Sequence, residues 1–183
     1  WSFLPDVWQS LWGGLPKLVL LAEFTGATQE DADHQANLSA HNIKQHFNLP
    51  LHICKSFEAS QKYWTIRRES YNLLRQHNAR LISAPFIEDV IVHPEQLPQF
   101  MPELHAIIEK YPDFISTIAG HAGDANFHII PLINLETEKH RKQIVQMSTE
   151  IFDLVLKYKG SMTGEHNDGL VRGPFLEHMY GPK

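Results

Sequence analysis

In the N-terminal third of the sequence, two apolar segments flank one segment whose apolar residues recur at helical spacing. Residues 17–24 (KLVLLAEF) are nearly all apolar and end just before a glycine turn, which is typical of a buried strand. Thr28 and Asp31 resemble a capping box, and apolar residues then recur at helical spacing until Pro50. Residues 51–54 are short enough for a second strand, so the pattern predicts a helix between two strands.

The middle of the sequence predicts two more helices and three strands. Residues 57–77 place aromatic and aliphatic side chains on one helical stripe. Residues 85–92 (PFIEDVIV) predict a strand, after which Pro94 is suited to open a helix. Residues 114–119 and 126–132 predict two strands that a glycine-containing turn joins.

The C-terminal part predicts a long helix over 136–158, which Gly160 caps, and a last short strand over 161–163. The resulting order of elements favours the α+β class, and we expect helices packed on one face of a largely antiparallel sheet. The connections are too short for a second domain. We therefore expect one domain over 1–183.

Composition excludes several classes of protein. The chain has 183 residues, of which 43% are hydrophobic and 20% charged, as expected of a soluble globular domain. Its net charge of −5, without a basic run, argues against nucleic acid as a partner. There is no apolar stretch of about 18 residues, so no membrane span is expected.

Cys54 is the single cysteine, which excludes an internal disulfide framework and an iron–sulfur cluster built from this chain alone. A reducing, cytoplasmic location fits this cysteine usage. We add the expectation of peripheral association with a membrane through an electron acceptor. The chain begins at Trp1 rather than at a methionine, and we expect it to be an excerpt of a longer protein.

The sequence contains 12 histidines, about three times ordinary usage, which directs attention to the histidines beside glycines. The first such stretch is GHAGDANFH at 120–128. Residues seven apart in one straight strand face opposite sides of it. The two glycines of this stretch permit a sharp turn, which would let His121 and His128 converge.

The second stretch is GEHNDG at 164–169. Two imidazoles and a carboxylate form an N,N,O site that suits zinc or another borderline divalent metal, and His121, His128 and Glu165 could supply it. Neighbours in an extended segment point apart, which leaves His166 free as a base. A histidine near glycines is, however, most often a turn or surface residue, and the spacing by itself leaves both interpretations open.

Arg67 lies inside the aromatic stripe of the second predicted helix, between Trp64 and Tyr71. In one interpretation its stem covers the aromatic rings and its charge reaches water. In the other, its guanidinium holds a substrate carboxylate through two hydrogen bonds, with Arg68 as the neighbour that could do so instead.

Four segments occur in the order WTIRR at 64–68, PFIEDVIV at 85–92, GHAGDANFH at 120–128 and GEHNDG at 164–169. Together they resemble the C-terminal domain of FAD-linked oxidases of the vanillyl-alcohol-oxidase type. This group contains D-lactate, D-2-hydroxyglutarate and glycolate dehydrogenases. The resemblance implies a ferredoxin-like sandwich that caps the flavin, and a separate FAD-binding domain of the same polypeptide, absent from this chain, that holds most of the FAD.

The resemblance also implies a reaction in which a base takes the hydroxyl proton of a small D-2-hydroxy acid while a hydride passes to FAD. A divalent metal, with zinc as the first choice, would bind the substrate. By itself, the fragment is expected to be inactive. The implied site residues are His121, His128 and Glu165 for the metal, His166 as the base, Arg67 for the substrate carboxylate and Asn126 for the cofactor.

Some positions depart from the pattern. GEHNDG stands where many relatives have GEHGxG, and Ala125 replaces a third glycine; both variants resemble the subgroup fused to an iron–sulfur domain. Ile87 and Ile130 are apolar where hydroxyglutarate-specific relatives carry polar groups, so the sequence leaves the particular acid open. Two other functions stay open as well: a metal- or ligand-binding module without catalysis, and a metal-dependent hydrolase.

Overall fold

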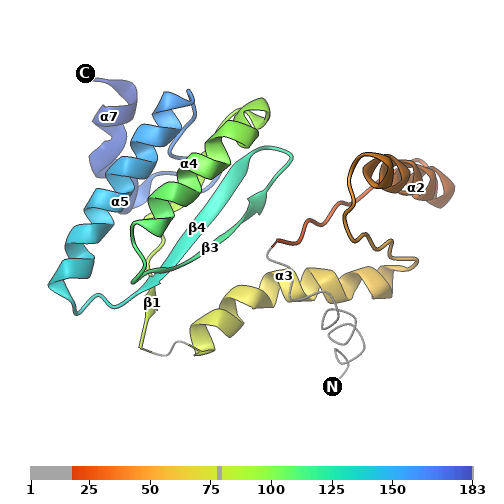
Figure 1. Ribbon diagram of the computed structural model, residues 1–183, viewed down its shortest axis with the longest axis horizontal. Coiled ribbons are helices and arrows are strands. Elements are labelled where there is room, and N and C mark those ends of the chain that lie inside the picture. Colours follow the sequence, from red (N-terminus) through yellow and green to blue (C-terminus); the bar gives the residue numbers. More distant parts are fainter. Residues whose placement is uncertain (1–17, 78–79, 183) are drawn as a thin grey trace. The chain divides into compact units, whose positions relative to one another are not determined.

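The computed structural model describes residues 18–77 and 80–182, without the side chains of 70–77 (Figure 1). The chain divides into two compact units, residues 1–70 and 71–183. The structure defines each unit by itself, so the two are described in turn.

The first unit contains α2 (Gln29–His46) and most of α3 (Phe57–His77). The predicted capping box is confirmed, because Thr28 Oγ1 accepts the Asp31 N–H and the Asp31 carboxylate accepts the Thr28 N–H. The bounds predicted for the second helix, 57–77, are also confirmed.

Both strands predicted in the first unit are wrong for the residues that the structure describes. Residues 18–24 and 51–54 have no regular secondary structure, and Leu18 and Leu20 are 72% and 70% exposed. A strand needs a neighbour to satisfy its backbone N–H and C=O groups, and the sheet that the structure describes is built from residues after 81. An apolar run therefore indicates burial in a strand only when a pairing partner exists.

The second unit is built on four antiparallel strands, β1 (Ile82–Ser83), β2 (Ile87–Ile91), β3 (Ile115–His121) and β4 (Asn126–Ile133). β4 is central: β3 pairs with it along one side, and β2 and β1 pair with successive parts of the other. The predicted strands over 85–92, 114–119 and 126–132 are confirmed within a few residues.

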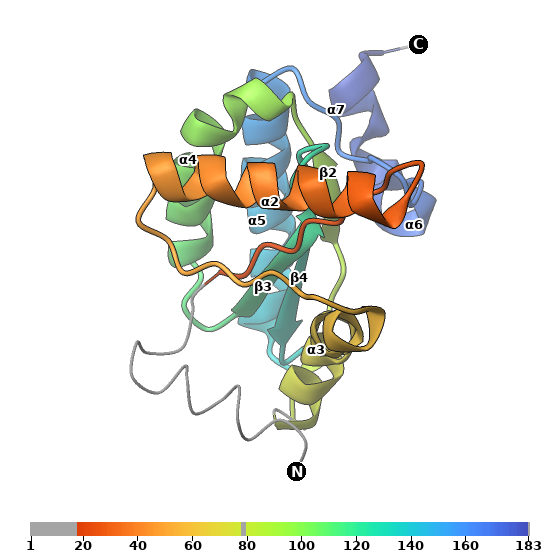
Figure 2. The ribbon, with the colours of Figure 1, turned by 90° about the vertical axis from the view of Figure 1, so that its right-hand side faces the viewer.

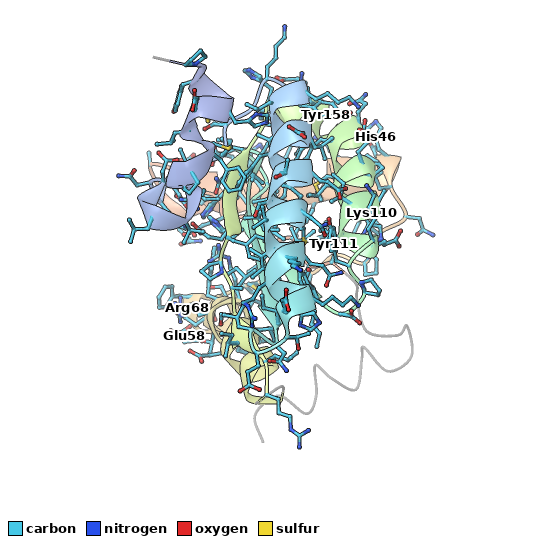
Figure 3. The ribbon with its side chains drawn as sticks, turned by 90° about the vertical axis from the view of Figure 1, so that its left-hand side faces the viewer. His46, Glu58, Arg68, Lys110, Tyr111 and Tyr158 are labelled. Atoms are coloured by element: carbon cyan, nitrogen blue, oxygen red, sulfur yellow. The ribbon has the colours of Figure 1, made fainter. Side chains whose placement is uncertain are left out.

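Two long helices pack on one face of this sheet, α4 (Leu97–Glu109), which the short helix η1 (Pro94–Gln96) precedes, and α5 (Glu138–Lys157) (Figures 1 and 2). Figure 3 shows the outer side of α5, with Lys110 and Tyr111 at the end of α4. The predicted α+β class is confirmed; the finer ferredoxin-like assignment stays a prediction. The fully buried side chains at this interface include Ile87, Val90, Phe100, Leu104, Ile129, Ile133, Met147, Ile151 and Phe152.

After α5 the chain forms no full strand at 161–163, where a strand was expected. Ser161 makes a single bridge to Ile91, and residues 162–168 form an irregular loop. Three short helices follow: α6 (Gly169–Arg172), η2 (Gly173–Phe175) and α7 (Leu176–Tyr180). Among the helices of residues 18–77 and 80–182, none combines the length and the apolar character that crossing a bilayer requires.

Candidate metal centre

A bulge in β2 places two consecutive acidic side chains at the centre. Ile87 pairs with Ile129 and Val90 with Phe127, so two residues of β2, Glu88 and Asp89, lie opposite the single residue His128. In a regular strand these neighbours would point to opposite faces of the sheet, and the extra residue of a bulge re-aims one of them. Both carboxylates reach the loop 162–168.

Asp89 anchors that loop. It is fully buried, and its two carboxylate oxygens accept hydrogen bonds of 2.8–3.2 Å. Burial raises the pKa of Asp89, but the hydrogen bond from His166 N–H and the others together outweigh it and lower the pKa to about 2. The donors are Asn126 Nδ2, Thr163 Oγ1 and the N–H groups of Gly164, Glu165 and His166.

The β3–β4 hairpin brings the two predicted imidazoles together. His121 pairs with Asn126 and Ala119 with His128, so both histidines lie on the same face of the sheet. Their ring centroids are 5.5 Å apart. Gly120 permits the close strand approach, because a Cβ there would lie 2.2 Å from the Asn126 carbonyl oxygen. The predicted convergence of His121 and His128 is confirmed as geometry.

Three imidazoles converge on a single carboxylate oxygen. The Nε2 atoms of His121, His128 and His166 lie 3.3, 3.1 and 3.3 Å from Glu165 Oε1. The rings of His128 and His166 stack with centroids 4.8 Å apart. The three side chains predicted to hold the metal, together with the predicted base, therefore surround one point.

One step of the sequence argument is wrong. Alternation along an extended segment was expected to separate the side chains of Glu165 and His166, but both point to the same centre. The reason is that residues 164–166 form bends rather than a strand, with three successive backbone N–H groups turned towards Asp89.

A carboxylate and a buried arginine hold His166. Its Nδ1–H donates to Glu88 Oε2 at 2.7 Å, and Arg172 NH1 donates to Glu88 Oε1 at 2.5 Å. The Arg172 side chain is 4% exposed and also donates to the Asn167 carbonyl oxygen. The hydrogen bond to Glu88, opposed by desolvation, raises the pKa of His166 above its usual value.

The donor set fits a divalent metal. Ligand atoms of Asp89, His128, Glu165 and His166 all lie within 4.8 Å of one another, and His121 joins them through Glu165. The carboxylate of Asp89 is already engaged with N–H and O–H donors, so it suits the anchoring of the loop better than coordination. Imidazole nitrogens and one carboxylate oxygen are donors that zinc and similar metals accept.

The predicted substrate arginine lies in the first unit. Arg67 is exposed on α3, and its guanidinium carbon lies 5.9 Å from the centroid of the Trp64 ring. This is the arrangement expected if Arg67 covers the aromatic rings and its charge reaches water. Arg68 donates to Thr65 Oγ1 on the same helix. The role of either residue as a carboxylate clamp stays a prediction.

Asn126, the predicted cofactor contact, is buried and donates through Nδ2 to Asp89 Oδ1 at 3.0 Å. Its own Oδ1 is buried and accepts no hydrogen bond within the described part of the chain, so one acceptor is left over. The cofactor role stays a prediction. Ile87 is fully buried in the core under α4 and α5, so core packing accounts for its apolar character.

Sequence reasoning missed Glu88, Asp89 and Arg172. The signal for the two acids was present in PFIEDVIV, because adjacent carboxylates inside an otherwise apolar strand are rare unless they are paired or hydrogen-bonded. Arg172 gave no such signal, since its burial depends on Glu88, which lies 84 residues earlier in the sequence.

Comparisons with known proteins identify the family of the chain. A family model described as FAD linked oxidases, C-terminal domain, matches residues 11–183. The chain is 29% identical to the D-2-hydroxyglutarate dehydrogenase of Stutzerimonas stutzeri over 88% of its own length and 34% of the relative. It is 24% identical to the Haemophilus influenzae D-2-hydroxyglutarate dehydrogenase over 89% of the chain and 16% of the relative.

The glycolate oxidase subunit GlcD of Bacillus subtilis is 31% identical over 54% of the chain and 21% of the relative. The chain thus spans about a third or less of the length of these proteins, with 34%, 16% and 21% covered. The match over residues 11–183 confirms the family resemblance seen in the motifs. The chain belongs to the family of FAD linked oxidases, C-terminal domain.

Proposed function

We propose that this chain is the substrate- and metal-binding part of a flavin-dependent dehydrogenase that oxidises a small D-2-hydroxy acid. The observation that carries the proposal is the convergence of three imidazole Nε2 atoms within 3.1–3.3 Å of Glu165 Oε1. The relatives include proteins named D-2-hydroxyglutarate dehydrogenase, glycolate oxidase subunit GlcD and D-lactate dehydrogenase. These names support the substrate class.

His121, His128 and Glu165 would hold the metal, and zinc is the first candidate. A bound divalent cation supplies positive charge that polarises a substrate oxygen and lowers the pKa of a hydroxyl group. An N,N,O donor set leaves positions for substrate, as catalytic sites require, whereas a fourth protein ligand would close the site.

His166 is the proposed general base. Because its Nδ1–H donates to Glu88, its Nε2 carries the lone pair and faces the centre. The side chain is 48% exposed, so a substrate hydroxyl can approach it. His166 Nε2 would take the hydroxyl proton, and proton transfer by a positioned histidine contributes about 10²–10⁴-fold to a rate.

FAD, held mainly by a separate domain of the same polypeptide, would supply the acceptor for the two electrons. The family assignment implies this cofactor. Arg67 or Arg68 would bind the substrate carboxylate, and a fused iron–sulfur domain would be a further electron acceptor.

The test uses the full-length protein that contains this chain. Dye reduction is measured with D-lactate, D-2-hydroxyglutarate and glycolate, alongside metal content. His166→Ala should lower kcat at least about 10²-fold while the metal remains bound. His121→Ala should remove both metal and activity. His105→Ala, on the exposed outer side of α4, is the matched control and should change neither.

Three outcomes would contradict the proposal. Loss of metal in His166→Ala would make His166 a fourth ligand and the centre a closed, structural one. Metal binding without dye reduction by any D-2-hydroxy acid would favour a binding module, and hydrolysis of esters or phosphates without flavin would favour a hydrolase.

A further inference from the structure

Glu88 contacts two of the three imidazoles, through different atoms. Its backbone carbonyl oxygen accepts a hydrogen bond of 2.7 Å from His128 Nδ1, and its carboxylate accepts one of 2.7 Å from His166 Nδ1. Carbonyl and carboxylate oxygens only accept, so both Nδ1 atoms carry the proton. Both Nε2 atoms are therefore unprotonated at neutral imidazole and face Glu165 Oε1.

The carboxylate of Glu88 has both oxygens engaged by donors. Oε2 accepts from His166, and Oε1 accepts from Arg172 NH1 at 2.5 Å. The Glu88 side chain is 16% exposed and the Arg172 side chain 4%. Removal from water strengthens a charge-assisted pair and limits the freedom of the carboxylate to turn.

An amide at this position could not do the same. If its oxygen accepted from Arg172, its NH₂ group would face His166 Nδ1 and could only donate. His166 would then have to accept at Nδ1 and carry its proton on Nε2, on the side of the centre. The shape of the side chain would be preserved, but the lone pair of His166 would point away from the site.

We propose that Glu88 is the positioning residue of this centre: its carboxylate, fixed by Arg172, sets the tautomer and orientation of His166, and its backbone carbonyl does so for His128. The inference rests on the proposed function for its kinetic consequence, though not for its structural one. The bulge in β2 is what allows Glu88 and Asp89 to serve the centre together.

The kinetic test compares Glu88→Gln with Glu88→Asp in the full-length protein. The glutamine variant should lose at least about 10²-fold in kcat with little change in KM, since the corresponding amide replacement in a Ser-His-Asp triad lowers kcat about 10⁴-fold through the wrong tautomer. The aspartate variant keeps a carboxylate and should recover part of the loss. Glu95→Gln, on an exposed turn before α4, is the control and should match the parent protein.

A second readout does not depend on turnover. In metal-free protein labelled with ¹⁵N-histidine, at a pH where the imidazoles are neutral, both His128 and His166 should show protonated Nδ1. Glu88→Gln should move the proton of His166 to Nε2. His128 should stay unchanged, because every substitution at residue 88 keeps the backbone carbonyl. Glu88→Asp is the second variant: it keeps a carboxylate that only accepts, so the proton of His166 should stay on Nδ1, and its appearance on Nε2 would count against the role of the carboxylate.

The outcomes separate the two ideas. A His166 tautomer that Glu88→Gln leaves unchanged, or a glutamine variant with the kcat of the parent protein, would overturn the role of Glu88. If no D-2-hydroxy acid is oxidised by the parent protein, the proposed function fails, while the tautomer measurement still decides whether Glu88 positions His166.

Discussion

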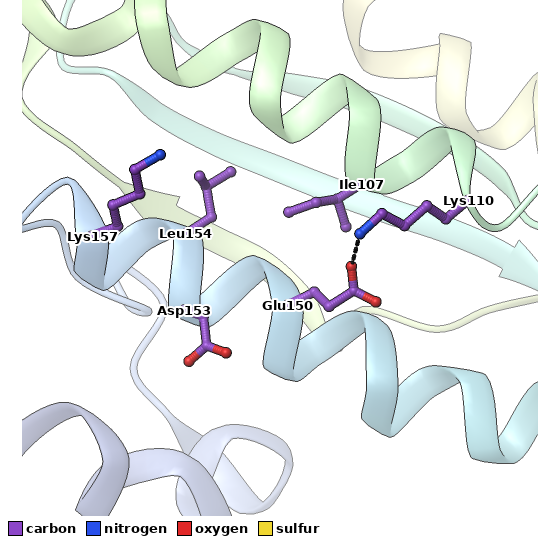
Figure 4. Close-up of a pocket in the computed structure, with 6 residues that line it drawn as sticks. All are labelled: Ile107, Lys110, Glu150, Asp153, Leu154 and Lys157. Atoms are coloured by element: carbon purple, nitrogen blue, oxygen red, sulfur yellow. Dashed lines mark hydrogen bonds and ion pairs between the residues drawn. The ribbon is translucent and has the colours of Figure 1, made fainter.

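Two clusters of charged side chains in the second unit differ in how their charges are balanced. On the outer side of the helices, a surface pocket of about 300 Å³ lies between α4 and α5 (Figure 4). There, Lys110 pairs with Glu150, and Lys157 donates to Glu103 at 2.6 and 2.7 Å. In the candidate metal centre, all the ion-pair contacts recorded for Glu165 in the described residues are to histidines.

Under the proposed function, this difference separates a structural cluster from a functional one. In the pocket, Lys110 lowers the pKa of Glu150 through its hydrogen bond, and both glutamates, Glu103 and Glu150, already pair with a lysine. In the centre, a carboxylate and three imidazole Nε2 atoms meet at one point, and among the described residues no lysine or arginine pairs with Glu165. A bound cation would complete such an arrangement. An unbalanced charge is therefore a better guide to the candidate site than pocket volume is.

The largest effect is expected from Asp89→Ala, which tests whether the loop depends on one buried anchor. The substitution leaves the N–H groups of Gly164, Glu165 and His166 without their acceptor, and it should cost about 3–5 kcal/mol of unfolding free energy. Urea denaturation measures it. Asp153→Asn, at the edge of the α4–α5 pocket, should cost less than about 1 kcal/mol; equal losses would contradict the comparison.

Acid should remove more stability from the centre than from the exposed ion pairs of the pocket. The folded-state pKa of Asp89 is depressed, so its contribution to stability is present above its ordinary pKa of 3.8 and is lost as pH falls towards about 2. The contribution is about 2 kcal/mol. Unfolding free energies of metal-free protein between pH 5 and pH 2.5 should show this loss in the parent protein and a smaller one in Asp89→Asn. Identical pH slopes would refute it.

Gly164→Ala tests how closely the loop packs. A Cβ at this position would lie 2.1 Å from Asn126 Nδ2, which is itself held by Asp89. We expect a loss of about 1 kcal/mol or more and weaker metal binding, measured by thermal unfolding and by competition with a chelator. Gly123→Ala is the matched control, since its Cβ would meet no atom within 4 Å. A tolerated Gly164→Ala would mean that the loop is free to shift.

The smallest effect is expected in the pocket. Lys110→Met removes the partner of Glu150, but the pair is solvent-exposed and should be worth less than about 1 kcal/mol. Metal content and turnover of the full-length protein should not change. A large loss of activity in this variant would show that the α4–α5 side contributes to function.

The sequence predicted most of the elements and most of the centre for physical reasons that can be named. Helical periodicity and the Thr28 capping box are local, so the start of α2 and both bounds of α3 were predicted. The hairpin that joins His121 and His128 is also local. The strands expected at 17–24 and 51–54 were wrong where described, because strand formation depends on a distant partner.

The support of the centre could not be predicted in the same way. The role of Glu88 depends on the bulge in β2 and on its contacts with His166 and Arg172, which lie 78 and 84 positions later in the sequence. It also depends on the burial of Arg172. A pattern of residue types does not record which strand carries the extra residue. The motifs therefore identified the groups that face the centre, but not those that aim them.

The central claim is that His121, His128 and Glu165 hold one divalent metal. The most direct measurement is anomalous diffraction at the metal absorption edge from crystals of the full-length protein. We predict one peak bounded by the Nε2 atoms of the two histidines and a carboxylate oxygen of Glu165. A metal peak elsewhere in the protein, or no peak there at saturating metal, would contradict the account.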